Sequence, residues 1–150
     1  MGELRDKIQK NEQHYIEFLQ NLIQFDTSVI RHGEDGQEEK AQIYLAEYLR
    51  NMGCEVQLFE PDNDVMKKYP SYNAGHSYKG RPVLVATYKG GGNGKSIILN
   101  GHIDTMPSGD LEKWYTNPWK MEIKDGKMYG LGTDDMKGGL ASEILGLELA

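Results

Sequence analysis

The chain contains 150 residues, 38% of them hydrophobic and 27% charged, which is the length and composition of about one globular domain. Its formal net charge is −6 at pH 7, and the sequence contains no run of basic residues. The electrostatic footprint of a protein that binds nucleic acid or an anionic membrane is therefore absent, and we expect neither as a partner.

Two helices are predicted in the first third of the chain, from apolar residues at helical spacing. The first should span about residues 3–25, and the polar stretch FDTSVIRHGEDG should end it. The second should follow the acidic residues Asp35, Glu38 and Glu39 and end at Gly53. Its apolar stripe consists of Ala41, Tyr44, Leu45, Tyr48, Leu49 and Met52.

Alternating and β-branched runs predict the first strands of an α/β domain. CEVQLFE, which begins at Cys54, predicts a strand with one apolar face, and residues 61–81 have the composition of a long polar loop. PVLVATY (82–88) and KSIILNG (95–101) predict a buried antiparallel hairpin across a short glycine-rich connection.

The C-terminal third should contain a second hairpin and a helix. Asp125-Gly126 lies between two alternating segments, which is the strongest short-range signal for a two-residue hairpin turn. Helical character resumes in MKGGLASEILGLELA and continues to Ala150 without a cap or stop signal. We therefore expect the chain to end inside an element, as a fragment of a longer protein.

The cellular compartment is inferred from targeting signals and cysteine content. No apolar run approaches the roughly 20 residues that cross a bilayer, and the N-terminus MGELRDKIQK is too polar for a signal peptide. Cys54 is the single cysteine, so it cannot form an internal disulfide; we expect a buried structural thiol in a reducing compartment. The expected location is the cytoplasm.

The glycine-rich run GGGNGKS (90–96) invites comparison with a phosphate-binding P-loop. The pattern G-x-x-x-x-G-K-[ST] fails, because Lys89 stands where the first glycine is required. A P-loop also precedes a helix whose amide groups face the phosphates, whereas SIILN has the pattern of a strand. We interpret the run as a hairpin turn in which glycines supply positive φ, and Lys95 as an exposed charge at the strand end.

His102-Ile103-Asp104 is a candidate metal-binding motif at the end of the strand predicted over 95–101. Side chains two positions apart on a strand point to the same side, so the imidazole and the carboxylate can meet while Ile103 faces the core. A metal-bound histidine normally donates its other ring N–H to a carboxylate. Taken alone the motif is weak, because an exposed or hydrogen-bonded histidine near a turn is the simpler explanation.

GLGTDDMKGG (130–139) places Asp134 and Asp135 at the junction between the second hairpin and the last helix. One carboxylate can bridge two divalent cations about 3.5–4 Å apart, as two-metal hydrolytic sites require. The structural alternative is helix N-capping and compensation of the helix dipole. The presence of His102 in the same chain favours the metal-binding interpretation.

The remaining histidines and the aromatic loop carry weaker signals. Three histidines have no partner at ligand spacing and are interpreted as structural or surface residues: His14, His32 and His76. Four residues follow the candidate site in a predicted loop, where they could line a cleft or cover the sheet edge, the latter being favoured: Trp114, Tyr115, Pro118 and Trp119.

The ordered pair LNGHIDTMP and NPWKMEIKDGKMYGLGTDDMKGGLAS resembles the family of acetylornithine deacetylases, succinyl-diaminopimelate desuccinylases and carboxypeptidase G-like metallopeptidases. The likeness covers nearly all of the chain. It implies a dinuclear zinc hydrolase of amide bonds with an α/β fold, in which a zinc-peptidase-like central mixed β-sheet is flanked by helices. Residues 1–150 would be the N-terminal part of the catalytic domain, truncated before that domain ends. The lid or dimerisation domain, through which the full-length protein would form a homodimer, would be missing.

The resemblance also implies roles for individual residues. His102 would be a ligand of one zinc ion, Asp104 the active-site residue that orients His102, and Asp135 the carboxylate that bridges both metals. In the family a cis peptide follows the bridging aspartate, so we expect the bond between Asp135 and Met136 to be cis. Asp134 aligns with a variable position and receives no role.

The chain departs from the family pattern in two respects. The family usually has Gly-Arg-Gly before the bridging aspartate, whereas Leu131 replaces the arginine here, which keeps the turn but removes a local charge partner. The paired glutamates, one of them the general base, another acidic ligand and the final histidine should lie beyond residue 150. Catalytic zinc sites normally have three protein ligands plus water, so we expect the 150 residues alone to be inactive.

The resulting hypothesis is a zinc-dependent N-acyl-amino-acid deacylase of acetylornithine deacetylase type, acting on a small N-acyl amino acid or a short peptide. Cobalt or manganese could occupy the same ligands. Within the enzyme class, the alternative is a dipeptidase or carboxypeptidase of the same family. From another class, the alternative is a non-catalytic metal-binding or interaction fragment.

Overall fold

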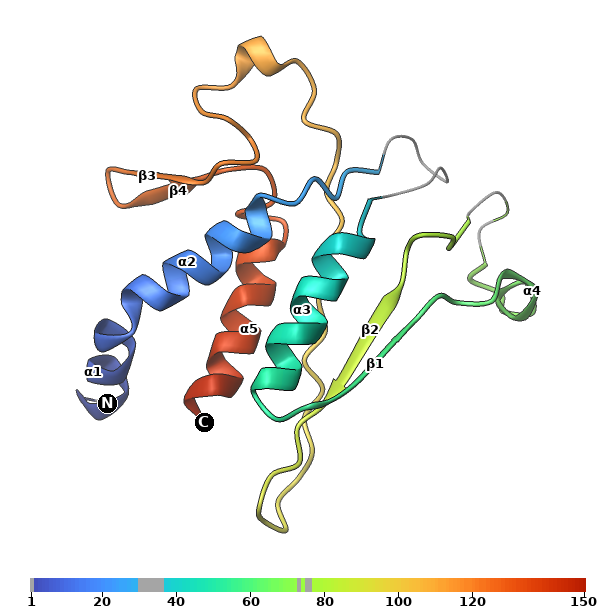
Figure 1. The fold of residues 1–150 in the computed structure, drawn as a ribbon, viewed down its shortest axis with the longest axis horizontal. Coiled ribbons are helices and arrows are strands. Elements are labelled where there is room, and N and C mark those ends of the chain that lie inside the picture. The colour runs from blue at the N-terminus through green and yellow to red at the C-terminus, as the bar shows by residue number, and fades with distance from the viewer. Residues whose placement is uncertain (1, 30–36, 73, 75–76) are drawn as a thin grey trace. The chain divides into compact units, whose positions relative to one another are not determined.

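The computed structural model (Figure 1) describes residues 2–29, 37–72, 74 and 77–150. The chain divides into two compact units. The first unit comprises Met1–Phe25, Leu99–His102 and Ser108–Ala150, and the second comprises Asp26–Ile98 and Ile103–Pro107. Helices and short antiparallel strand pairs occur in both units, which confirms the predicted α/β class. Among the described helices, none has the length and apolar character that crossing a membrane requires.

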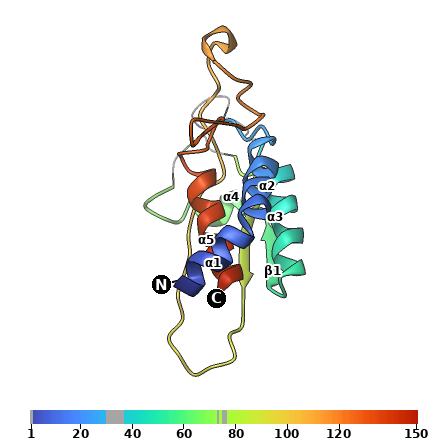
Figure 2. The ribbon, with the colours of Figure 1, turned by 90° about the vertical axis from the view of Figure 1, so that its left-hand side faces the viewer.

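The first unit is built on the packing of α2 (Glu12–Ile23) against α5 (Lys137–Leu149), which Figures 1 and 2 show as neighbouring helices. Each helix presents apolar residues at a spacing of three or four, so one stripe can be buried while the opposite face stays in water. The buried apolar residues are Phe18, Leu19, Leu22 and Ile23 of α2, and Ala141, Ile144 and Leu145 of α5.

The single helix predicted over residues 3–25 is wrong, because the structure breaks it at Asn11 into α1 (Gly2–Lys10) and α2. The Asn11 side-chain amide donates a 2.9 Å hydrogen bond to the Lys7 carbonyl, and the φ of −108° at Asn11 lies outside the helical region. A short polar side chain that bonds to nearby backbone competes with helix continuation. Because α1 buries no residue, packing does not oppose the break.

The second predicted hairpin is confirmed. β3 (Glu122–Lys124) and β4 (Lys127–Tyr129) pair antiparallel, with Asp125 and Gly126 between them. These two residues have φ values of 52° and 72°, and two-residue turns of this kind need positive φ at both positions. A short 3-10 helix, Leu111–Lys113, lies in the loop that precedes the hairpin along the chain.

In the second unit, α3 (Glu39–Asn51) packs on the antiparallel pair formed by β1 (Glu55–Phe59) and β2 (Val83–Thr87). Its buried residues are Ala41, Leu45, Ala46 and Leu49. Gly53, with a φ of 91°, follows the helix in the left-handed conformation, so the predicted stop is confirmed. The acidic residue Asp35, expected near the start of this helix, lies outside the described residues.

A buried ion pair joins the start of α3 to the segment before β2. Arg81 donates from Nε to Glu38 Oε1 at 2.8 Å, and its second guanidinium nitrogen lies 2.7 Å from the same oxygen. The Glu38 residue is only 5% exposed. Removing either partner would leave a buried charge uncompensated, which makes this contact a constraint on how the loop and helix can lie within the second unit.

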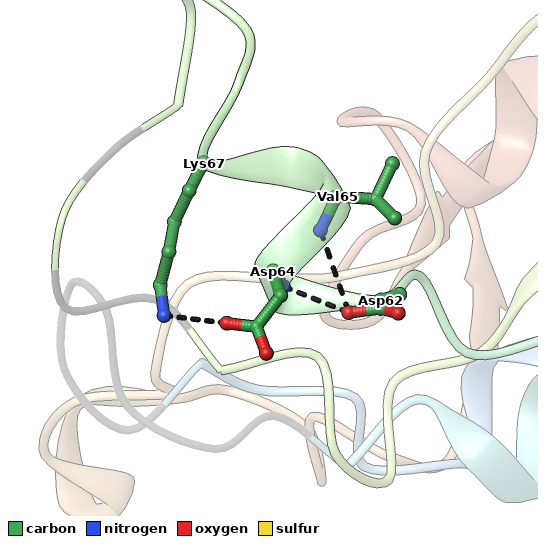
Figure 3. Close-up of polar contacts among 4 residues, drawn as sticks. All are labelled: Asp62, Asp64, Val65 and Lys67. Atoms are coloured by element: carbon green, nitrogen blue, oxygen red, sulfur yellow. Dashed lines mark hydrogen bonds and ion pairs between the residues drawn. The ribbon is translucent and has the colours of Figure 1, made fainter.

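The loop predicted over residues 61–81 contains one turn of helix, α4 (Asn63–Met66), shown in Figure 3. The Asp62 carboxylate caps it by accepting hydrogen bonds from the backbone amides of Asp64 at 2.8 Å and Val65 at 3.4 Å. Lys67 donates to Asp64 at 2.8 Å, and this hydrogen bond, together with the lysine charge, lowers the pKa of the Asp64 carboxyl. Both side chains are exposed, so the pair contributes little to stability.

The predicted hairpin between residues 82–88 and 95–101 is wrong. β2 pairs with β1, from Glu55↔Thr87 to Phe59↔Val83, whereas residues 95–101 belong to no strand in the described part of the chain. The glycine-rich run forms a loop beyond β2 (Figures 1 and 2), and its glycines do not take the positive φ that we expected. Strand propensity identifies an extended segment, but the pairing partner is set by tertiary contacts.

The exposure of this segment, residues 95–101, is relevant to the central mixed sheet that the resemblance implies. Ile97 and Ile98 are 80% and 89% exposed, although their sequence pattern is that of a buried strand. The described strands form two separate antiparallel pairs, and the central mixed sheet is not assembled among them.

Truncation of Leu22 to alanine tests the packing of α2 on α5. Leu22 is fully buried, so we expect Leu22→Ala to lower the free energy of unfolding by about 2–5 kcal/mol, through lost apolar burial and the cavity left behind. Leu4→Ala on the exposed α1 is the matched control and should change it by less than about 0.5 kcal/mol. Urea unfolding measures both; equal effects would contradict the assigned core.

Cys54 should react slowly with a disulfide reagent in the folded protein. Burial raises the pKa of its thiol, so the reactive thiolate is scarcer at neutral pH than in the unfolded chain. Folding raises the pKa of the thiol, so the neutral thiol contributes fully to the free energy of unfolding at pH values below the unfolded-state pKa. This contribution is lost as the pH rises through the folded-state pKa. The rate of thiol labelling should increase on unfolding in urea, and equal rates in both states would contradict this assignment.

Candidate functional site

His102 and Asp135 meet in the first unit. His102 Nε2 lies 2.9 Å from Asp135 Oδ1, although the residues are 33 positions apart in the chain. The two side chains are 47% and 84% exposed, so solvent and small solutes can reach the nitrogen and oxygen atoms. The structure therefore brings together two of the three residues that the sequence singled out.

Gly101 brings the backbone before His102 close to the start of α5. A Cβ atom at Gly101 would lie 3.0 Å from Met136 Cε and 3.2 Å from Leu140 Cδ1. A larger residue would press on both side chains, so the glycine permits the approach that places the imidazole beside Asp135.

Asp135 lies in a tight loop, residues 130–136, immediately before α5. Thr133 Oγ1 donates to the Gly130 carbonyl at 2.9 Å, and the Lys137 amide donates to the Gly132 carbonyl at 2.9 Å. A Cβ atom on Gly138 would lie 2.2 Å from the Thr133 carbonyl oxygen, so the close approach of helix and loop requires glycine there. These contacts define the path of the backbone that carries Asp135.

The peptide bond between Asp135 and Met136 is cis, which confirms the expectation drawn from the family resemblance. The neighbouring turn is intact although Leu131 replaces the usual arginine. Gly132 has a φ of 85°, and the Leu131 amide donates to the Pro118 carbonyl at 2.7 Å.

The structure does not support helix capping as the role of the two aspartates. The N-cap residue of α5 is Met136, and no side chain makes a capping hydrogen bond there. Asp135 is directed to His102 instead, and Asp134 is exposed. The structure thus places Asp135 in contact with His102, and the metal-binding role of Asp135 stays a prediction.

Asp104 belongs to the second unit, and its segment is held by its neighbours within that unit. The Thr105 amide donates to the Thr27 carbonyl at 3.0 Å, and Thr27 Oγ1 donates to the Ile103 carbonyl at 2.7 Å. Ile103 is buried, as the alternation predicts, and Asp104 is half-buried. The buried threonine and its hydrogen bond, which fix the backbone at Asp104, carry no signal in the sequence.

The other histidines do not join the pair in the described residues. His14 lies on α2, half-exposed, with Nε2 3.2 Å from Glu148 Oε2. His32 and His76 lie outside the residues that the structure describes. The interpretation of His14 as a surface residue agrees with its position.

The aromatic loop lines a hollow of about 370 Å³, which also includes Tyr129 of β4 and Thr133 of the loop before α5. Trp114 and Tyr115 both contribute to the lining, and Trp114 Nε1 donates to the Ser108 carbonyl at 2.8 Å. Trp114 is half-buried at this hollow, Tyr115 is fully exposed and Pro118 is buried, so the structure does not decide between lining a cleft and covering the sheet edge.

The chemistry of the pair fits a divalent metal ion. A neutral imidazole nitrogen and a carboxylate oxygen are both zinc ligands, and two such atoms at about 2.0–2.1 Å from a tetrahedral ion lie roughly 3.3 Å apart. The 2.9 Å between His102 Nε2 and Asp135 Oδ1 is close to that spacing. In the part of the chain that the structure describes, no group of three or more His, Cys, Asp or Glu side chains is placed to hold a metal.

Residues 98–149 match the sequence profile of peptidase family M20/M25/M40, and this segment contains both His102 and Asp135. The chain is 30% identical over 148 residues to an N-formyl-4-amino-5-aminomethyl-2-methylpyrimidine deformylase of Halalkalibacterium halodurans, covering 97% of this chain and 30% of that protein. It is 31% identical over 129 residues to a succinyl-diaminopimelate desuccinylase of Wolbachia pipientis subsp. Culex pipiens, covering 86% and 26%.

A metallohydrolase of Methanocaldococcus jannaschii without assigned function is 32% identical over 142 residues, covering 89% of this chain and 33% of that protein. The fold resembles the crystal structure of human carnosine dipeptidase 1, with a TM-score of 0.73 at 16% identity, covering 97% of this chain and 30% of that chain. The chain thus spans about a third of the length of the curated relatives it matches. From the matched segment and these relatives, we conclude that the chain belongs to peptidase family M20/M25/M40.

Proposed function

We propose that this chain is the N-terminal part of the catalytic domain of a zinc-dependent amide hydrolase, in which His102 and Asp135 are metal ligands. The observation that carries the proposal is the 2.9 Å contact between His102 Nε2 and Asp135 Oδ1, at an exposed position within the segment that matches the family. A bound zinc ion would supply Lewis-acid polarisation of the scissile carbonyl and activation of water. Cobalt or manganese could be held by the same two residues.

The two side chains have distinct tasks in this proposal. His102 offers a ring nitrogen as a ligand, which requires that Nε2 carry no proton when the metal is bound. Asp135 offers a carboxylate with two oxygens, one of which faces His102, and it is the residue proposed to bridge two metal ions. Further ligands and the general base would come from segments outside these 150 residues.

Asp104 is proposed to orient the His102 imidazole. The two residues are separated in the chain by one residue, Ile103, which is buried. A carboxylate that accepts a hydrogen bond from the second ring nitrogen of a metal-bound histidine sets the tautomer and raises ligand basicity. Asp104 is half-buried on a segment fastened to Thr27, which suits a residue of fixed position.

The proposed substrate class is a small N-acyl amino acid or a related small amide. Two relatives at 30% and 31% identity are named a deformylase and a desuccinylase, which supports removal of an acyl group. The dipeptidase is related by fold at 16% identity, so peptide cleavage is the second candidate. A homodimeric full-length protein in the cytoplasm is part of the same proposal, and its support is the family membership and the single buried cysteine.

Hydrolysis assays on the full-length protein that contains these 150 residues would separate the two candidates. The assays compare N-formyl, N-acetyl and N-succinyl amino acids with dipeptides that carry the same side chains. If the enzyme recognises the acyl group, we expect it to cleave the N-acyl amino acids faster than the dipeptides. Preference for the dipeptides would select the peptidase alternative, and activity towards neither would favour a non-catalytic metal-binding fragment.

Replacement of His102 should remove one metal site. In His102→Ala, we expect zinc content measured after dialysis to fall by about one equivalent, and turnover to fall by at least roughly 100-fold, because a ligand is lost. His14→Ala is the matched control, since His14 is a similarly exposed histidine of the same unit. Unchanged zinc content and turnover in His102→Ala would exclude the proposed site.

Replacement of the Asp104 carboxylate should weaken the site without removing a ligand. Asp104→Asn keeps the size of the side chain but loses its charge, and we expect a loss of about 10–100-fold in zinc affinity or activity. Asp64→Asn, at an exposed position of the same unit, is the control and should behave as the parent protein. If both variants have the affinity and activity of the parent, Asp104 has no orienting role.

A further inference from the structure

Lys137 is a buried lysine that the proposed chemistry does not use. It is the first residue of α5 and only 1% exposed. Its Nζ donates to the carbonyl oxygens of Leu22, in the last turn of α2, at 3.1 Å and of Phe25, two residues beyond the end of α2, at 2.8 Å. The last carbonyls of a helix have no partner within the helix, and lysine side chains are suited to them by both hydrogen bonding and the helix dipole.

The same residue also closes the loop that carries Asp135. The Lys137 amide donates to the Gly132 carbonyl at 2.9 Å, so the backbone from Gly132 to Lys137 forms a closed turn. The side chain of Lys137 therefore attaches this turn to α2, while its backbone defines the turn itself. Asp135 lies two residues before this attachment point.

A lysine is an unfavourable choice for stability alone at this position. Taking an amino group out of water is costly, and a buried polar group is retained without loss only when it is hydrogen-bonded. An apolar residue of similar length would fill the same volume against α2 without that desolvation. What it could not do is select one position of the turn relative to α2, because apolar packing is non-directional whereas the two hydrogen bonds are directional.

We propose that Lys137 is a positioning residue that holds the Asp135 carboxylate beside His102, by fastening the turn of residues 132–137 to the end of α2. The inference rests on the proposed function in so far as the pair binds metal. The contact between His102 and Asp135 exists in the structure independently of that role, so the positioning can be tested separately.

The first test observes the His102 ring in the metal-free full chain. In protein labelled with 15N at histidine, the ring signals of the four histidines are assigned with His102→Ala and His14→Ala. Lys137→Met, which removes the donor at similar length, should shift the His102 signals. Leu145→Ala, which removes buried packing further along α5, is the matched control for loss of stability and should leave them in place.

The second test measures zinc affinity by competition with a chromophoric chelator, and the visible spectrum of the cobalt-loaded full chain. Lys137→Met should bind zinc about 10–100-fold more weakly and alter the cobalt spectrum, as loss of a residue that orients a ligand does. Leu145→Ala should match the parent protein in both. If Lys137→Met and Leu145→Ala give the same affinity, spectrum and His102 signals, the positioning role is overturned.

Lys137→Gln keeps an N–H donor in a side chain with as many atoms along its length as methionine, and it is the variant to use if Lys137→Met does not fold. Its zinc affinity and His102 signals should lie between those of the parent and those of Lys137→Met, and a Gln variant indistinguishable from Leu145→Ala overturns the inference.

The failure of the proposed function and the failure of the positioning role give different results. If the parent protein binds no zinc at His102, the proposed function fails, but the His102 ring signals still test the positioning role of Lys137. If His102→Ala abolishes zinc binding and Lys137→Met does not weaken it, only the positioning role fails.

Discussion

The packing of α5 against α2 is the interaction on which the candidate site depends. It buries apolar stripes from both helices and places the first residue of α5 against the last carbonyls of α2. The turn that carries Asp135 precedes α5 directly, so its position within the first unit follows from where that helix begins. Gly138 is part of the same constraint, because a side chain there would collide with the Thr133 carbonyl oxygen.

The site combines a rigid support with exposed functional atoms. The residues that hold it, Gly101, Gly138 and Lys137, act through close backbone approach and buried hydrogen bonds, whereas the His102 and Asp135 side chains remain open to solvent. Such a division suits a ligand site, since a metal ion needs ligands of fixed position that it can reach. Family membership gives the arrangement a chemical context.

Local patterns predicted the elements better than they predicted pairing. The Asp125-Gly126 turn and the stop at Gly53 follow from the need for positive φ, a property of single residues that the sequence displays directly. The break at Asn11 was missed because an asparagine side chain competes with the helix only where packing does not oppose it. The wrong prediction of a hairpin at residues 95–101 has a related cause. A β-branched run favours extended backbone, but it does not specify which strand the segment pairs with.

The sequence by itself determined the α/β class, the family and the identity of the candidate residues His102, Asp104 and Asp135, because these are carried by short motifs and local periodicity. Only the tertiary structure decided that His102 meets Asp135, that neither aspartate caps α5, and that Lys137 is buried at the end of α2. The contacts of His102 and Lys137 join residues that are 33 and 115 positions apart. Contacts over such separations arise from the packing of whole elements, which no local pattern of residues encodes.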